Sequence, residues 1–404
     1  MTPKRKFLTV LLLGSLTTIV PFSIDMYLPG FPDIAVALHT TVSSVALSLS
    51  SFFIGIGIGQ LLYGPLLDRF GRKKPLYAGL LLYCVASVGC ALSNSIEMLI
   101  ALRFVQAIGA CAGSIAATAM VRDFFPPEEN AKIFSFLMLV LSVSPMLAPT
   151  IGSYISVGFG WGYIFIVLTF LIVLIFFGVL LFLPQSRPPD KDFSLRPAAI
   201  LKSYRDVLRE KYFYFYALSG GIALASLFTY IASSPGIFIG YFSLTKQQYG
   251  LLFALLAAGL IISSQVNTLL LRKYKSESVT LGAIIAQNVI ALTMFLLSIT
   301  GHLQFWGLVA FLFCYLSSVG FILPNASALA MRPFEKNAGS ASALLGFIQM
   351  GLGSLATVGI GVLHIQGVRP MTTAMALASL LGLIVCALSV RALRGDPSEA
   401  GTPA

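Results

Sequence analysis

The sequence predicts an all-α membrane protein of about twelve transmembrane helices, arranged as two pseudo-symmetric halves of six. Of its 404 residues, 57% are hydrophobic and only 10% are charged. Soluble domains carry about 25% charged residues, so water cannot be the solvent for most of this surface. A spanning helix needs roughly 20 apolar residues, and twelve of them use about 240–280 positions. No room remains for a separate soluble catalytic domain.

Each span is expected to be a helix, because a helix satisfies its own backbone hydrogen bonds in lipid. Glycine and proline are plentiful within the spans, as expected where transmembrane helices approach closely or break. In chain order, hydropathy places the spans at residues 8–30, 43–66, 76–94, 97–121, 132–153, 161–183, 213–236, 247–271, 278–300, 304–329, 339–363 and 371–391.

A polar, basic segment at residues 184–212 divides the spans six and six. It joins an N-terminal half, residues 1–183, to a C-terminal half, residues 213–391, and we expect the tail at 392–404 to be disordered. Equal halves joined by a linker are typical of parallel repeats in transporters. Within the linker, residues 201–211 can form a short amphipathic surface helix or a solvated basic stretch.

The net charge of +11 sets topology. If the N-terminus is cytoplasmic, the basic residues fall inside, except Lys246 and Arg369 outside and Arg103 within a span. This asymmetry follows the positive-inside rule, so the basicity predicts no nucleic-acid partner. No A-x-A-like cleavage site follows the first span, which predicts a retained signal anchor. We expect a multi-pass protein of the bacterial inner membrane, with both termini cytoplasmic.

The residues that usually hold metals or form disulfides are scattered. The three histidines lie near outer loops, and an odd set of cysteines within spans argues against disulfides and metal clusters. The sequence also lacks a G-x-x-x-x-G-K-[ST] phosphate loop. We therefore expect no cofactor and no metal. The five cysteines are Cys84, Cys90, Cys111, Cys314 and Cys386.

Asp25 is the acid that falls well within a predicted span. A carboxylate at membrane depth is costly, and its presence suggests a function. Burial disfavours the charged form, so such a group exchanges protons nearer neutral pH than an exposed one. The alternative is an acid that pairs helices and never titrates.

Arg103 is the embedded base, and it lies near the outer half of its span, as Asp25 does. The two side chains can therefore lie at similar depth and pair. A substrate or a conformational change that separated them would release the acid to take up a proton. A permanent salt bridge that only fixes helix packing is the alternative.

Several motifs resemble a known family. Residues 61–74, LLYGPLLDRFGRKK, resemble the signature loop of the major facilitator superfamily. Residues 21–29, PFSIDMYLP, and residues 145–152, PMLAPTIG, are similar to the first-helix and fifth-helix motifs of twelve-helix drug:proton antiporters. Arg103-x-x-Gln106 resembles their fourth-helix motif. Residues 337–343, NAGSASA, are similar to the branch of bicyclomycin-resistance and chloramphenicol exporters (Bcr/CflA).

The chain departs from the family pattern at three small residues. Ala148 and Ser153 replace glycines of the fifth-helix motif, and Ala107 replaces the glycine that commonly follows the fourth-helix glutamine. These residues are still small, so close helix packing survives.

The resemblance implies a major facilitator fold, proton coupling through Asp25 and Arg103, and a cytoplasmic latch that helps hold the outward-facing state. The alternatives are a plain positive-inside loop and prolines that serve packing alone. The residues expected to act in gating are Gly64, Asp68, Arg69, Gly71, Arg72, Pro145, Pro149 and Gly152.

A central cavity is expected between the halves, lined by methionine, aromatic and amide side chains that suit varied ligands. Each of these residues is individually more typical of a helix core. The candidate substrate contacts are Met26, Tyr27, Gln106, Met138, Phe228, Tyr230, Gln265, Asn325, Phe347 and Gln349.

The function predicted is efflux of small amphipathic drugs by alternating access, in exchange for protons. We expect a monomer whose partners are a small-molecule substrate, protons and the lipid bilayer. An exporter or importer of an endogenous metabolite such as a sugar, amino acid or siderophore is the alternative. A membrane enzyme or channel would need a catalytic cluster or a pore-lining ring, and the spans show neither.

Overall fold

The computed structural model describes residues 3–184, 186, 189, 197–334, 338–363 and 367–393, and these are helical apart from short connections. Twelve stretches are long and apolar enough to cross a membrane, in the order and close to the positions predicted from hydropathy. Large apolar side chains face outward from them, among them Val85, Phe170 and Leu377. That exposure suits a surface solvated by lipid.

The N-terminal half is α1 (Pro3–Asp25) with η1 (Leu28–Gly30) and α2 (Phe31–Ala37), then α3 (Val42–Phe70), α4 (Lys73–Ala91), α5 (Ile96–Phe124), α6 (Pro127–Phe159) and α7 (Gly162–Phe182). A connecting helix, α8 (Pro197–Leu208), follows. The C-terminal half is α9 (Lys211–Ser234) with η2 (Pro235–Tyr241), then α10 (Lys246–Leu270), α11 (Ser276–Ile299), α12 (Phe305–Met331), α13 (Ala338–Leu363) and α14 (Arg369–Leu393).

Local chemistry fixes several of these ends. The hydroxyl of Thr41 caps α3, that of Ser95 caps α5, and Thr245 and Gln248 form a reciprocal capping box at α10. At Pro235, α9 passes into the π-helical turn η2. Proline lacks an N–H and clashes with the preceding turn, which disfavours a continued α-helix there.

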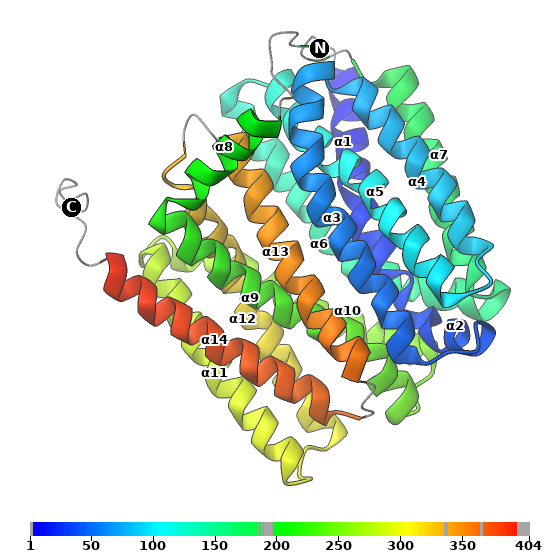
Figure 1. The fold of residues 1–404 in the computed structure, drawn as a ribbon, viewed down its shortest axis with the longest axis vertical. Coiled ribbons are helices and arrows are strands. Elements are labelled where there is room, and N and C mark those ends of the chain that lie inside the picture. The colour runs from blue at the N-terminus through cyan, green and yellow to red at the C-terminus, as the bar shows by residue number, and fades with distance from the viewer. Residues whose placement is uncertain are drawn as a thin grey trace.

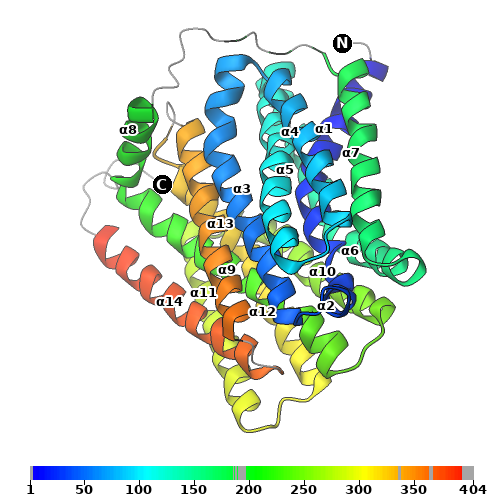
Figure 2. The same cartoon turned by 45° about the vertical axis from the view of Figure 1, so that its right-hand side comes forward.

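The two halves meet mainly through two helix pairs, α3 with α13 and α6 with α10. Figure 1 shows the first of these pairs side by side. The two pairs are the second span against the eleventh and the fifth against the eighth. A six-span shift exchanges one pair for the other, as expected for two repeats related by an axis along the membrane normal. Figure 2 also shows α13 beside α3, with α14 and α11 on the far side of the C-terminal half.

The bundle has two ends. The α8 end carries α8, the start of α1 and the turn between α3 and α4; the α2 end carries α2 and η2 (Figure 2). Of the two alternatives for this part of the linker, an amphipathic helix or a solvated basic stretch, the amphipathic helix forms, as α8. The Tyr204 hydroxyl donates to the Leu61 carbonyl of α3 (3.1 Å), and the Ser203 hydroxyl donates to that of Ser340 on α13 (2.9 Å). The connecting helix therefore touches both halves.

Some predictions fall outside the described residues. They include most of the linker between 184 and 197, Asn337 of the motif at 337–343, and the tail from 394 onward.

Candidate functional site

A cavity of about 620 Å³ lies between α3, α5 and α13. That volume is in the range of sites for drug-sized ligands. Its lining residues recur at helical spacing: Gln60, Gly64 and Asp68 on α3, Ser114, Thr118 and Arg122 on α5, and Ser342, Gly346 and Gln349 on α13. Asp68, Arg72, Arg122 and Asp123 lie at the α8 end, so the cavity reaches from that end toward the centre of the bundle.

Arg72 holds the mouth of this cavity together on the N-terminal side. Its guanidinium donates to the carboxylates of Asp68 (2.7 Å) and Asp123 (2.9 Å), which joins the ends of α3 and α5. Burial alone would lower the pKa of Arg72, but the hydrogen bonds and negative charges of Asp123 and Asp68 outweigh it and raise that pKa. The guanidinium therefore stays charged at any physiological pH.

Gly71 allows the chain to turn between α3 and α4. Its φ of 78° lies in the left-handed region that favours glycine. Gly64, by contrast, lies inside α3, and apart from its own stretch of helix no described residue comes within 4 Å of the place where a Cβ would stand. Gly71 thus serves a turn, whereas Gly64 forms no close contact with another described helix in this conformation and leaves open space in the cavity.

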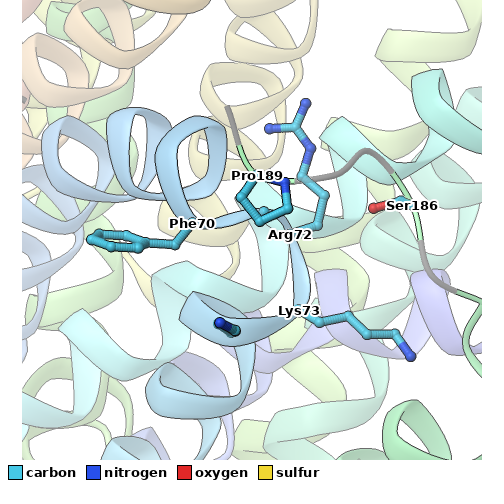
Figure 3. Close-up of a pocket in the computed structure, with 7 residues that line it drawn as sticks. Phe70, Arg72, Lys73, Ser186 and Pro189 are labelled. Carbon is cyan, nitrogen blue, oxygen red and sulfur yellow. The ribbon is translucent and has the colours of Figure 1, made fainter. Parts of the chain in front are cut away.

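A smaller pocket of about 50 Å³ adjoins the turn (Figure 3). Phe70, Arg72 and Lys73 line it together with Ser186 and Pro189 from the chain that follows α7. Its volume suits one or a few water molecules. The larger cavity is therefore the candidate for a drug-sized ligand.

The α2 end is closed by contacts between the halves. Lys246 at the start of α10 forms an ion pair with Asp33 on α2 and donates to the Ser156 hydroxyl on α6 (3.2 Å). Asp33 thus lies on a short helix of the N-terminal half and bridges the two halves. Beside it, Gly250 of α10 packs against the backbone of Pro149 and Thr150 on α6.

The centre of the bundle is also closed on this side of the cavity. The rings of Phe53 on α3 and Phe228 on α9 are stacked with centroids 3.8 Å apart. Ser50 on α3 donates to the Thr357 hydroxyl on α13 (2.7 Å). The cavity therefore reaches one end of the bundle and not the other.

Asp25 ends α1 within the closed region. Asp25 is 4% exposed, and its carboxyl forms neither a hydrogen bond nor an ion pair with another described residue. It interacts electrostatically with the hydroxyls of Tyr230 on α9 and Tyr249 on α10. The Tyr230 hydroxyl is buried without a described partner, while that of Tyr249 bonds to Ser234 (2.7 Å). A carboxyl of the first half is thus within electrostatic range of two hydroxyls of the second.

Arg103 does not pair with Asp25, so the pairing expected from their similar depth is wrong for this conformation. Its guanidinium donates to the Gln106 side chain (2.6 Å) and to the Ser23 carbonyl (3.0 Å). The guanidinium carbon also lies 4.1 Å from the centre of the Phe52 ring and 4.7 Å from that of Tyr27. Hydrogen bonds and aromatic faces therefore satisfy this charge instead of a carboxylate.

Of the predicted substrate contacts, Gln349 lines the cavity. Met26, Tyr27, Gln106, Phe228, Tyr230 and Asn325 are buried in the packed helices. Asn325 bonds to Asn267 (2.7 Å) and Ser276 (2.6 Å) inside the C-terminal half. Phe347 is part-exposed near Gly57, and Met138 and Gln265 are exposed.

The predicted gating residues divide between the ends. Asp68, Arg69 and Arg72 lie at the α8 end, and Pro149 and Gly152 are buried toward the α2 end of α6. Pro145 is half-buried one turn earlier in α6. Gly152 permits a close approach, since a Cβ there would lie 2.0 Å from the Met26 carbonyl oxygen.

Comparison with known proteins agrees with this architecture. Residues 13–358 match the Major Facilitator Superfamily. The chain belongs to that superfamily. It is a multi-pass membrane transporter and not an enzyme. A solved D-xylose-proton symporter superposes with a TM-score of 0.72 over 94% of this chain and 96% of its own, at 14% identity, which supports the fold alone.

Three relatives cover almost the whole chain. An uncharacterised MFS-type transporter of Bacillus subtilis, YdgK, is 34% identical, with 94% of this chain and 95% of the relative covered. A chloramphenicol resistance protein of Pseudomonas aeruginosa is 31% identical, with 96% of this chain and 92% of the relative covered. A bicyclomycin resistance protein homolog of Haemophilus influenzae is 27% identical, with 92% of this chain and 93% of the relative covered. The predicted resemblance to this branch is confirmed.

Proposed function

We propose that this transporter exports small amphipathic drugs from the cytoplasm in exchange for protons. The observation that carries the proposal is a cavity between the halves that reaches only the α8 end, with the unpaired Asp25 carboxyl buried in the closed region beyond it. The names of the bicyclomycin and chloramphenicol resistance relatives support drugs as the substrate class.

We infer that the α8 end lies in the cytoplasm, because basic residues gather there, including Arg69, Arg72, Lys73 and Lys74. In the bacterial inner membrane this orientation puts both termini inside, and the present conformation faces inward. A substrate enters the cavity from the cytoplasm. The halves, residues 1–183 and 213–391, then rock so that the contacts at the α2 end open and the mouth beside Arg72 closes.

Asp25 couples this motion to protons. Between the halves its carboxyl is largely removed from water and forms no ion pair with a cation among the described residues, so the neutral, protonated form is the one that the closed region tolerates. When the α2 end opens, external water and protons reach it. Protonation permits the α2 end to close around Asp25. Deprotonation accompanies the step in which the cavity is again open to substrate from the cytoplasm.

The energy of one proton is sufficient for resistance. One charge moved through 100 mV is worth about 2.3 kcal/mol, and about 1.4 kcal/mol corresponds to a tenfold ratio. A single net charge per cycle therefore supports a gradient of roughly forty-fold. One cavity and one coupling carboxyl lie within a single chain, so we propose a monomer as the working unit.

Transport direction tests the proposal. In inverted inner-membrane vesicles, acidification of the lumen should drive accumulation of an antibiotic, such as chloramphenicol, and an uncoupler should abolish it. Accumulation in right-side-out vesicles alone, or of sugars and amino acids but no antibiotic, would instead favour the importer or metabolite transporter.

A further inference from the structure

Gln60 occupies a distinctive place in the cavity. It lies on α3 where that helix crosses α13. Eight residues separate it from Asp68 at the mouth, which corresponds to about 12 Å along the helix at 1.5 Å per residue. A Cβ on Gly346 of α13 would stand 1.4 Å from the Gln60 Oε1 atom. The amide of Gln60 therefore fills the space that glycine leaves open on the opposite half.

This amide is half-buried and makes no hydrogen bond to another described residue. Gln349, one turn beyond Gly346, donates its Nε2 to Ser327 (3.2 Å) and also lines the cavity. Ser114 and Thr118 of α5 line the same space; their hydroxyls donate to carbonyls of their own helix and leave oxygen lone pairs as acceptors. The inner cavity thus offers neutral donors and acceptors from both halves.

The charged residues that line the cavity all lie at its mouth, and their formal charges cancel: two acids, Asp68 and Asp123, and two bases, Arg72 and Arg122. Asp68 and Asp123 both bind the Arg72 guanidinium at the mouth. Arg122, the other charged lining residue, has no ion-pair partner among the described residues. An organic cation that moves past the mouth into the inner cavity therefore loses water without meeting a carboxylate, and that desolvation is unfavourable. An uncharged polar molecule exchanges water for amides and hydroxyls at little cost.

We propose that the cavity selects uncharged polar amphipathic substrates over organic cations, and that Gln60 is a residue that determines this specificity. The inference rests on the proposed function for the identity of the cavity as the substrate site. It adds the charge class of the substrate and the residue that recognises it. Gln60 lines the cavity and also packs against Gly346 of the other half. A ligand that binds Gln60 therefore also affects the contact between the halves.

Equilibrium binding to the purified full-length protein tests the inference. The probes are radiolabelled chloramphenicol, thiamphenicol and florfenicol, which are uncharged, and tetraphenylphosphonium and ethidium, which are cations. The parent should bind at least one uncharged probe about tenfold or more tighter than either cation, a difference of about 1.4 kcal/mol. Equal or tighter binding of the cations, or no binding of any uncharged probe, overturns the proposal.

Three variants show whether Gln60 is responsible. Gln60→Glu should raise cation binding and lower uncharged binding, because it places a free carboxylate in the cavity. Gly346→Ala should weaken uncharged binding, because its methyl displaces the far end of Gln60, a flexible group that can move without unfolding the helix. Gly351→Ala, on the same helix with open space around it, should match the parent. An unchanged preference in both Gln60→Glu and Gly346→Ala contradicts the role of Gln60.

This outcome is separable from proton coupling. Binding is measured without a gradient, so a transporter that is not proton-driven still reports its charge preference. Conversely, loss of the preference in Gln60→Glu with intact proton-driven export would leave the coupling account untouched.

Discussion

Arg103 is fully buried, and the fold satisfies it with the Gln106 amide, the Ser23 carbonyl and the faces of Phe52 and Tyr27. Its Nε has no described partner. Gln106 in turn donates to the Ser87 hydroxyl (3.1 Å), so the network ties α5 to α1 and α4. This charge fixes the packing of the N-terminal half around Asp25.

Replacing Arg103 should therefore destabilise the protein. Arg103→Ala removes two hydrogen bonds to a charged donor, each worth about 1.5–3 kcal/mol. Arg103→Lys keeps the charge but loses the forked geometry, so its loss should be smaller. Thermal unfolding in detergent measures both. Arg122→Ala, at an exposed residue of the same helix, is the control and should unfold within about 0.5 kcal/mol of the parent. A stable Arg103→Ala protein would contradict the packing role.

Sequence placed Asp25 and Arg103 at similar depth but could not give the direction in which each side chain points. Depth follows from position in the span, whereas pairing depends on helix rotation and on competing acceptors. Gln106, three residues from Arg103, lies on the same helix face and supplies such an acceptor. That spacing was visible in the sequence as Arg103-x-x-Gln106 and indicates the hydrogen bond better than a distant acid does.

Among the elements, α6 packs most tightly on the residues around Asp25. The backbone of Met26 lies directly against Gly152, where any side chain would collide with the Met26 carbonyl. The neighbouring Ser153 hydroxyl bonds back to the Thr150 carbonyl (2.7 Å), so the serine that replaces the motif glycine turns toward its own helix. The sequence departure is thereby accommodated.

Gly152→Ala should separate α6 from η1 and displace Asp25. The obstacle is backbone rather than a flexible side chain, so overpacking of about 1–3 kcal/mol is expected, together with loss of transport. Gly158→Ala is the matched control on the same helix, since nothing lies within 4 Å of its Cβ position. Expression level, unfolding temperature and transport are compared. Normal transport in Gly152→Ala would show that this contact is dispensable.

At the scale of elements, hydropathy predicted all twelve spans, because burial in lipid requires long apolar runs. The cavity lining was largely missed. Gln60, Ser114, Thr118 and Ser342 are ordinary polar residues, and only their recurrence every four residues on α3, α5 and α13 marks a wet helix face. Of the aromatic and methionine side chains proposed instead, Met26, Tyr27, Phe228 and Tyr230 are buried in the packed helices, whereas Met138 is exposed.

The whole molecule is held in its present shape by contacts at the α2 end. The Lys246–Asp33 ion pair crosses the halves and is only partly exposed. A pair of this kind is worth about 1 kcal/mol, which corresponds to roughly a fivefold change in the ratio of open to closed states. The sequence could not predict that the α2 end is the closed one, because the same residues must also permit the conformation that is open at the α2 end and closed at the α8 end.

Breaking that pair should favour opening at the α2 end. In Asp33→Asn, a cysteine reporter at Ser50 should react several-fold faster with a membrane-impermeant thiol reagent added from outside, in a background with the native cysteines replaced. Glu277→Gln removes a carboxylate that pairs with Arg332 within the C-terminal half and should leave the rate unchanged. If Asp33→Asn labels no faster than the parent, the ion pair does not hold the closed state.

Proton-driven export by this transporter depends on Asp25 exchanging a proton when the halves change the side to which they open. The most direct measurement compares the parent with Asp25→Asn in proteoliposomes, using an antibiotic that the parent exports. Asparagine keeps the shape but cannot titrate, so accumulation driven by a pH gradient should vanish while binding and downhill exchange persist. Uphill accumulation by Asp25→Asn at the rate of the parent would contradict proton coupling through this carboxyl.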